Sequence, residues 1–345
     1  MINNLRTFSF FLAITLSVMS CSKNDPFRLD ETVYIRHDGA DMPAYIHGNS
    51  EDKVFIVVLH GAGSFGLAFR YGTFVSELEK RYAVVYWDQR GQGMSQGHYS
   101  QADDIIEQMA HDVSALISVL KYNYGDDIKL FLMGHSWGGL LGTTALLMPG
   151  MQSQFTGWIA VDAALDIPLA EQSRIPLMYA IADEQIGLQS GISEWKKIEN
   201  ELSGLDASRD EDYNDILKLA KKTMGLLVKT GVVSPLAIAE KAYPGLVENN
   251  PVTWLISNFF NKPINAAIAK DYSLTERLNE IYLPSLLIWG KYDVSVPPVI
   301  AYNAMLKLGS SNKKLVIFEK SMHHPFDTEP DHFAEEVIRF IETNR

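Results

Sequence analysis

Six short apolar runs, each followed by a glycine or a polar residue, constrain the fold of this chain more than any other feature. They are Val54–Leu59, Ala83–Trp87, Lys129–Met133, Trp158–Val161, Ser285–Trp289 and Lys314–Phe318. Near-continuous apolar runs of this length are typical of strands that are buried on both faces of a sheet. Helical periodicity lies between or after them, for example over Ile105–Leu120 and Phe333–Ile341. Strands that alternate with helices predict an α/β fold with a doubly wound, mainly parallel sheet.

The alternation is interrupted at two places. Residues 38–41 are turn-rich and separate two short strand-like runs, which predicts an antiparallel hairpin before the parallel strands. Between residues 166 and 271 the pattern is helical, as over Tyr213–Val228, and contains no clear strand. We therefore expect a core that carries an inserted helical cap. The predicted divisions are residues 31–165 and 272–345 for the core and residues 166–271 for the cap.

The amino-terminal residues have the pattern of an export signal. The apolar stretch Phe8–Val18 follows a positive start and is too short for a typical membrane-spanning helix. The residues VMSCS that end it resemble a bacterial lipobox, in which the chain is cut before a cysteine that carries the lipid. We expect a signal peptide at residues 1–20, lipidation at Cys21, a tether over residues 21–30, and a lipoprotein of the cell envelope, periplasmic or outer-membrane. An ordinary cleaved secretory signal and an uncleaved anchor are the alternatives.

Composition limits the partners of this chain. The formal net charge is -12, which disfavours nucleic acid because phosphate-binding proteins are usually basic. Cys21 is the only cysteine, so neither an internal disulfide nor a cysteine-rich metal site is possible. The histidines lack metal-binding spacing such as H-E-x-x-H. We expect no metal or organic cofactor, no nucleic-acid partner, and membrane contact through the lipid anchor only.

Residues 134–138, with the sequence GHSWG, match the G-x-S-x-G pattern of a nucleophile elbow. In this pattern the serine occupies a sharp turn between a strand and a helix, and the glycines allow the two elements to approach closely. An apolar run precedes the motif and the helical pattern Leu140–Met148 follows it. We predict that Ser136 is a nucleophile. A glycine-rich turn without chemistry is the alternative interpretation.

A serine hydroxyl needs a histidine base, and that histidine needs an orienting acid. In this architecture the acid and then the histidine follow the serine along the chain. Asp293 follows the fifth apolar run and is the predicted acid, with Asp162 as the alternative. His323 and His324 both follow the last run, and we predict His323 as the base.

A developing oxyanion needs two hydrogen-bond donors. The backbone N–H of Trp137, the residue after the nucleophile, is the first predicted donor. The second is expected from the loop after the first apolar run, HGAGS, where we predict the N–H of Ala62 with Gly61 as second choice. His60 precedes the glycine turn and is expected to be structural.

From about Val54 to the C-terminus, these residues resemble the α/β-hydrolase superfamily. The segment YWDQRGQGMS at residues 86–95 looks like the D-Q-R-G-x-G-x-S loop of its proline iminopeptidase branch, the serine aminopeptidases of the S33 type. The last motif of that branch is a histidine with a proline two residues later, then a further proline and a phenylalanine. His323, Pro325, Pro330 and Phe333 fit that spacing. The early loop departs from the typical H-G-G-P-G.

The resemblance implies an acyl-enzyme mechanism, most simply in an aminopeptidase that acts on short peptides or small molecules. In that branch, carboxylates of the cap bind the free amino group of the substrate. The acidic cap residues considered are Glu171, Asp183, Glu184 and Glu194, of which Glu171 and Glu184 are the first candidates. Solvated helix faces are the alternative interpretation. A carboxylesterase, lipase or thioesterase on the same triad, or a non-catalytic binding protein, are the alternative functions.

Overall fold

The computed structural model describes residues 25–97, 105–234 and 271–345, and these contain one eight-stranded sheet. The strands are β1 (Arg28–His37), β2 (Ala40–Asn49), β3 (Val54–Leu59), β4 (Ala83–Trp87), β5 (Lys129–His135), β6 (Gly157–Val161), β7 (Ser285–Gly290) and β8 (Lys313–Phe318). Their order is β1-β2-β4-β3-β5-β6-β7-β8. The pairs β1–β2 and β2–β4 are antiparallel and the other pairs are parallel. The predicted fold class is confirmed.

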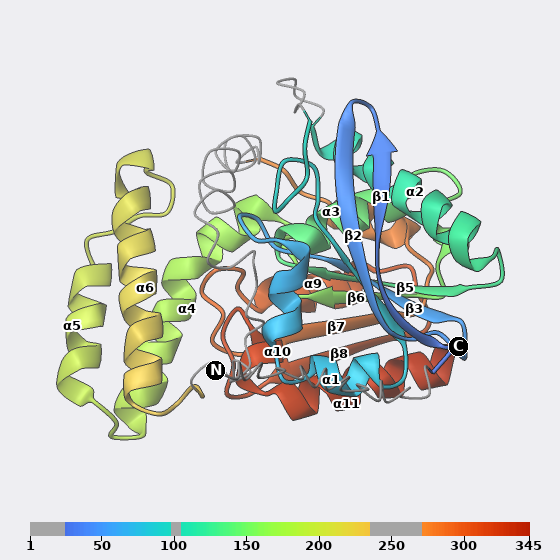
Figure 1. Ribbon diagram of the computed structural model, residues 1–345. Helices are drawn as coiled ribbons and strands as arrows, with labels where there is room; N and C mark the ends of the chain where they lie inside the picture. Colours follow the sequence, from blue (N-terminus) through green and yellow to red (C-terminus); the bar gives the residue numbers. More distant parts are fainter. Residues whose placement is uncertain (1–24, 98–104, 235–270) are drawn as a thin grey trace, which may run out of the picture.

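Helices cover both faces of the sheet (Figure 1). Those packed on one face are α2 (Ile105–Tyr124), α3 (Trp137–Leu146) and α9 (Val299–Lys307). Those on the other are α1 (Val75–Glu79), α10 (Pro325–Thr328) and α11 (Pro330–Asn344). Strand β3 shows why the central runs are continuously apolar. Phe55 and Val57 belong to one core and Ile56 and Val58 to the other, because successive side chains of a strand point to opposite faces.

Three helices inserted after β6 form a separate layer beside the core (Figure 1). They are α4 (Ile167–Gly187), α5 (Ile192–Leu202) and α6 (Tyr213–Lys229). Their apolar faces form one hydrophobic cluster together with Tyr292 and Val294 of the loop after β7, and Trp195 and Leu227 are fully buried in it. Residues 235–270, the remainder of the predicted cap, lie outside the described residues.

Asp166 joins the point where the chain leaves the core to the point where it returns. Its Oδ1 accepts a hydrogen bond from the N–H of Leu169 at 2.9 Å and caps the first turn of α4. Its Oδ2 accepts hydrogen bonds from Ser273 Oγ at 2.8 Å and Thr275 Oγ1 at 2.7 Å. The two crossings between core and cap are therefore held together by one carboxylate.

The structure describes only part of the amino-terminal region for which predictions were made. The predicted signal peptide and Cys21 lie outside the described residues. Strand β1 begins at Arg28, so the end of the predicted tether, residues 28–30, is wrong. These residues pair with β2 although their side chains are mostly exposed and polar. In the described part of the chain, no helix is both long and apolar enough to cross a bilayer.

The crossing of α3 over β3 generates a prediction on stability. A Cβ added to Gly138 would lie 2.0 Å from the backbone oxygen of Leu59, and backbone cannot easily move away. We expect Gly138→Ala to lower the free energy of unfolding by about 3 kcal/mol or more through overpacking, measured by urea denaturation. The control is Gly225→Ala in α6, where nothing lies within 4 Å of the added Cβ. Helix propensity should make that variant more stable by about 0.5–1 kcal/mol. Equal effects of the two substitutions would contradict the predicted crowding.

Candidate active site

Ser136 occupies a strained turn between β5 and α3. Its φ is 54° and its ψ is -118°, values that residues with a Cβ rarely adopt. The turn is fixed by its backbone: the N–H donates to Val161 O at 3.0 Å and the carbonyl accepts from Ala164 N at 3.1 Å. Gly134 permits the helix to start this close, since a Cβ there would lie 2.4 Å from Gly138 O. The serine side chain is thereby presented at the carboxyl end of the strand.

His323 and Asp293 are joined by a hydrogen bond, with 2.7 Å between His323 Nδ1 and Asp293 Oδ2. Asp293 is completely buried in the loop after β7. Its Oδ1 accepts the backbone N–H groups of Ser295 and Val296 at 2.8 and 3.0 Å. The carboxylate is therefore held in one orientation while it fixes the imidazole of His323.

The neighbouring histidine is placed differently. The side chain of His324 is 47% exposed, and its nearest ionic neighbour is Asp327 at 3.6 Å. Its carbonyl accepts the N–H groups of Asp327 and Thr328 at the start of α10. Of the adjacent pair, His323 is the residue that contacts the predicted acid.

His135, inside the G-x-S-x-G motif, is a site residue that the sequence argument did not identify. Its Nε2 donates to the carbonyl of His323 at 2.8 Å, and the two ring centroids are 4.7 Å apart. Burial, followed by the neighbouring His323 and His324, lowers the pKa of His135 well below its usual range. A neutral His135 thus supports the loop that carries His323. The sequence feature that could have identified His135 is its position directly before Ser136.

Asp162, the alternative acid, is completely buried at the end of β6 and accepts the N–H of Gly290 at 2.9 Å. One potential metal-ligand atom from each of His135, Asp162 and His323 lies within 4.8 Å of the other two. No second group of three or more such residues is found in the described part of the chain. His135 donates to the carbonyl of His323, and His323 bonds to Asp293, so each histidine already has a protein partner at one ring nitrogen.

The loop after β3 passes directly beside Ser136. A Cβ added to Gly61 would lie 3.5 Å from Ser136 Cβ and 3.2 Å from His135 Nδ1. Within the described chain, the N–H groups of Ala62 and Trp137 donate no hydrogen bond to another protein group. Two amides near the nucleophile are therefore available to a developing oxyanion.

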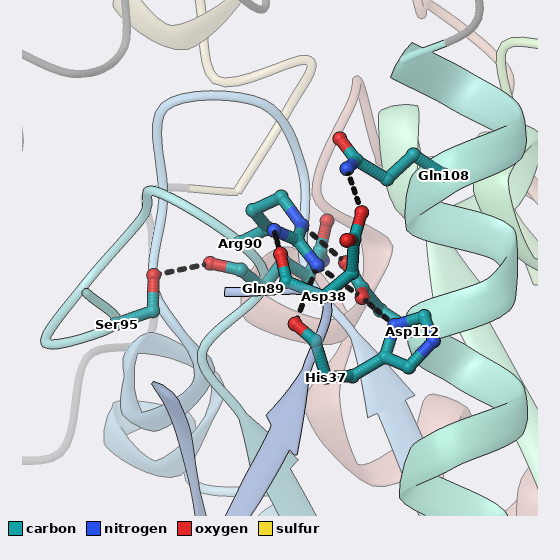
Figure 2. Close-up of polar contacts among 7 residues, drawn as sticks. All are labelled: His37, Asp38, Gln89, Arg90, Ser95, Gln108 and Asp112. Carbon is teal, nitrogen blue, oxygen red and sulfur yellow. Dashed lines mark hydrogen bonds and ion pairs between the residues drawn. The ribbon is translucent and has the colours of Figure 1, made fainter. Parts of the chain in front are cut away.

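A buried ion pair anchors the D-Q-R-G segment to the hairpin and to α2 (Figure 2). The guanidinium of Arg90, which is completely buried, donates to both carboxylate oxygens of Asp112, at 2.7 and 2.6 Å. It also donates to the carbonyls of His37 and Asp38 at 2.9 Å each. Asp112 lies on the predicted helix α2 but carries no sequence signal for this contact.

The anchored segment in turn holds the two loops that flank Ser136. Gln89 Nε2 donates to His60 O at 2.9 Å, and Gln89 Oε1 accepts the indole N–H of Trp137 at 3.0 Å. The carbonyl of Gln89 accepts Ser95 Oγ at 2.8 Å, a contact that Figure 2 shows within the loop. One glutamine therefore connects Trp137, whose N–H is one candidate oxyanion donor, to His60, two residues before the other candidate, Ala62.

The candidate cap carboxylates have different surroundings. Glu171 forms an ion pair with Arg174 at 3.2 Å and lines a cavity of about 630 Å³ at the start of α4. Glu184 accepts hydrogen bonds from Lys291 Nζ at 2.9 Å and Tyr292 Oη at 3.1 Å, so it ties α4 to the segment before Asp293. Glu194 lies on the outer surface of α5. Each of the two first candidates therefore lines a cavity and has a cationic partner, Arg174 for Glu171 and Lys291 for Glu184.

The sheet topology, the serine on a strained turn and the family comparison define a hydrolase of the α/β-hydrolase superfamily. The serine aminopeptidase S33 family matches residues 50–234, more than half of the chain, and the chain belongs to this family.

Relatives within and around this family include peptidases and esterases. The chain is 26% identical over 262 residues to a proline iminopeptidase of Saccharolobus solfataricus, an alignment that covers 75% of this chain and 76% of the relative. The crystal structure of a proline iminopeptidase from Mycobacterium smegmatis superposes with a TM-score of 0.62 at 14% identity, covering 91% and 98% of the two chains. An esterase from a Rhodococcus species superposes with a TM-score of 0.58 at 19% identity, covering 92% and 99%. The structural likenesses show the shared fold.

The buried His60 generates a prediction on pH dependence. Burial lowers its pKa from 6.5 to about 4, so the unfolded chain binds the proton more readily. Stability from this group is full above pH 6.5 and is lost as pH falls toward 4. We expect the stability difference between wild type and His60→Gln to shrink by up to about 3 kcal/mol over this range, measured by urea unfolding at each pH. A difference that is independent of pH would contradict a neutral His60.

Proposed function

We propose that this hydrolase is an aminopeptidase of the proline iminopeptidase type, with Ser136, His323 and Asp293 as its catalytic triad. The observation that carries the proposal is the 2.7 Å hydrogen bond between His323 and the buried Asp293. This bond orients His323 as a base. The loop that carries His323 is contacted by His135, the residue before Ser136. That arrangement is the one a serine nucleophile requires.

In the proposed first step, Ser136 Oγ attacks the substrate carbonyl while His323 Nε2 takes the hydroxyl proton. The N–H groups of Trp137 and Ala62 stabilise the resulting oxyanion. When the intermediate collapses, His323 returns the proton to the leaving amine, and an acyl-enzyme ester remains on Ser136. Asp293 keeps the proton of His323 on Nδ1 and stabilises the imidazolium.

In the second step, water attacks the acyl-enzyme ester while His323 accepts one of its protons. Collapse of this second intermediate expels Ser136 Oγ, which recovers the proton from His323. The products are an amine and a carboxylic acid, and the enzyme returns to its starting state.

Family membership and the cap support a peptide substrate with a free amino terminus. The S33 match and the proline iminopeptidase relatives indicate the substrate class. The cavity at the start of α4 is lined by Glu171, whose carboxylate, paired with Arg174 at 3.2 Å in the structure, is the proposed partner of a substrate ammonium group. Esterase activity of the carboxylesterase, lipase or thioesterase type is the alternative, favoured by the esterase among the structural neighbours. A non-catalytic binding protein is the second alternative.

A fluorophosphonate probe and two substrate types test this proposal. We expect the probe to label wild type but not Ser136→Ala, while Ser118→Ala, at an exposed position on α2, labels like wild type.

Asp293→Asn should lower kcat by about 10⁴-fold because the imidazole takes the wrong tautomer. Prolyl arylamides should be hydrolysed faster than short acyl esters. Hydrolysis of the esters alone would exclude the peptidase and retain the hydrolase, whereas no labelling of wild type would exclude both.

We also propose that the protein is an envelope lipoprotein, on the basis of the lipobox-like residues around Cys21. In a bacterial host, processing of the full chain should be blocked by globomycin, and Cys21→Ala should abolish lipid attachment. Fractionation and metabolic labelling with a fatty acid measure both effects. Cys21→Ser, which keeps the size of the side chain but lacks the thiol, is the matched control and should behave like Cys21→Ala. Release of unlipidated soluble wild type would overturn this proposal in favour of an ordinary secretory signal.

A further inference from the structure

Asp162 is a buried carboxyl group whose hydrogen bonding is incomplete if it is ionised. Its side chain is fully buried, and its backbone has a positive φ of 42°. One oxygen, Oδ1, accepts the N–H of Gly290 at 2.9 Å. The other, Oδ2, has no hydrogen-bond donor among the described residues. An ionised carboxylate buried in this way would lack the compensation that buried charges require.

The groups that face Asp162 do not supply that compensation. They are Asp293 after β7, His135 at the end of β5 and His323 in the loop after β8. His135 is held neutral by burial, and its Nε2 donates to the carbonyl of His323. His323 directs Nδ1 to Asp293. The group left to pair with Asp162 is therefore the carboxyl of Asp293, which is itself an acceptor.

We propose that Asp162 is a positioning residue that carries a proton and donates it in a hydrogen bond to Asp293. The acid of the triad is then a pair of carboxyl groups that share one proton and one negative charge. This inference rests on the proposed function, since it assigns Asp162 a task in a reaction that Ser136 and His323 perform.

Electrostatics supports a single charge on this pair. Burial, followed by the negative charge of Asp293, raises the pKa of Asp162 well above its usual range. Two carboxylates in one site cannot readily both ionise, so one of them retains its proton. Asp293 is the member that accepts, because three N–H groups already point at its oxygens.

The shared proton has two effects on His323. The fourth donor further restricts rotation of the Asp293 carboxylate, which orients the imidazole toward Ser136. The pair also presents one negative charge to His323 instead of two. A second negative charge would make His323 more basic, and the histidine would then be protonated and unable to act as a base over a wider pH range.

Rates of Ser136 labelling by a fluorophosphonate, measured against pH, test this assignment. Asp162→Ala removes the donor, and we expect the labelling rate to fall by about 10- to 100-fold through misorientation. Asp162→Asn is the matched variant, because its neutral amide can donate the same hydrogen bond. It should recover the rate to within about five-fold of wild type, with the acidic limb of the profile at the wild-type pH. Asp293→Asn serves as the control that loses the orienting charge.

Two outcomes would overturn the assignment. If Asp162 were ionised, Asp162→Asn would remove a negative charge beside His323 and shift the acidic limb to lower pH. If Asp162→Asn were impaired as much as Asp162→Ala, hydrogen-bond donation would not be its role.

Infrared difference spectra of wild type against Asp162→Asn at neutral pH provide a readout that does not depend on activity. We expect a carboxylic acid C=O band in wild type that the variant lacks, and its absence would overturn the proposal. The band decides the matter even if Asp162→Ala does not fold. Failure of wild type to react with the probe would instead refute the proposed function and leave the infrared result valid.

Discussion

The backbone turn at Ser136 is the constraint on which the rest of this structure depends. A helix that begins one residue after a strand ends must cross the neighbouring strand at backbone contact distance. Gly134, Gly138 and Gly139 are positions where this crossing leaves no room for a Cβ. The positive φ of Ser136 is sustained by hydrogen bonds from the β6 segment on both sides of the peptide. Local strain at the serine is thus balanced by sheet and helix packing around it.

Much of the fold was predictable because central parallel strands are buried on both faces. Their sequences are continuous apolar runs, which few other elements produce at that length. The positions of Ser136, Asp293 and His323 beyond strand ends could be predicted for a related reason, since residues just beyond strand ends gather at one edge of the sheet. The start of the edge strand β1 could not be predicted. Its outer residues are exposed and polar, so no apolar signal marks Arg28 as the start.

Other parts of the site depend on contacts between distant segments that no local pattern encodes. Asp112 could be assigned to a helix, but its pairing with Arg90 requires the D-Q-R-G segment to lie against that helix. His135 could be placed beside the nucleophile, but its bond to the carbonyl of His323 spans 188 positions of the chain. Glu184 could be assigned to the cap, but its hydrogen bond to Lys291 joins the cap to the core. Pairings of this kind are set by tertiary packing and not by residue type.

The carboxylate of Asp166 bears on how such a protein can diversify. It fixes the chain segment that enters the cap and the segment that leaves it at one point. The cap is therefore attached to the core as a loop that is closed at its base. Replacement, lengthening or reshaping of the inserted helices need not alter the sheet register or the turn at Ser136. The cap can therefore change in evolution while the core with its turn at Ser136 is retained. This is consistent with peptidases and esterases among proteins of one architecture.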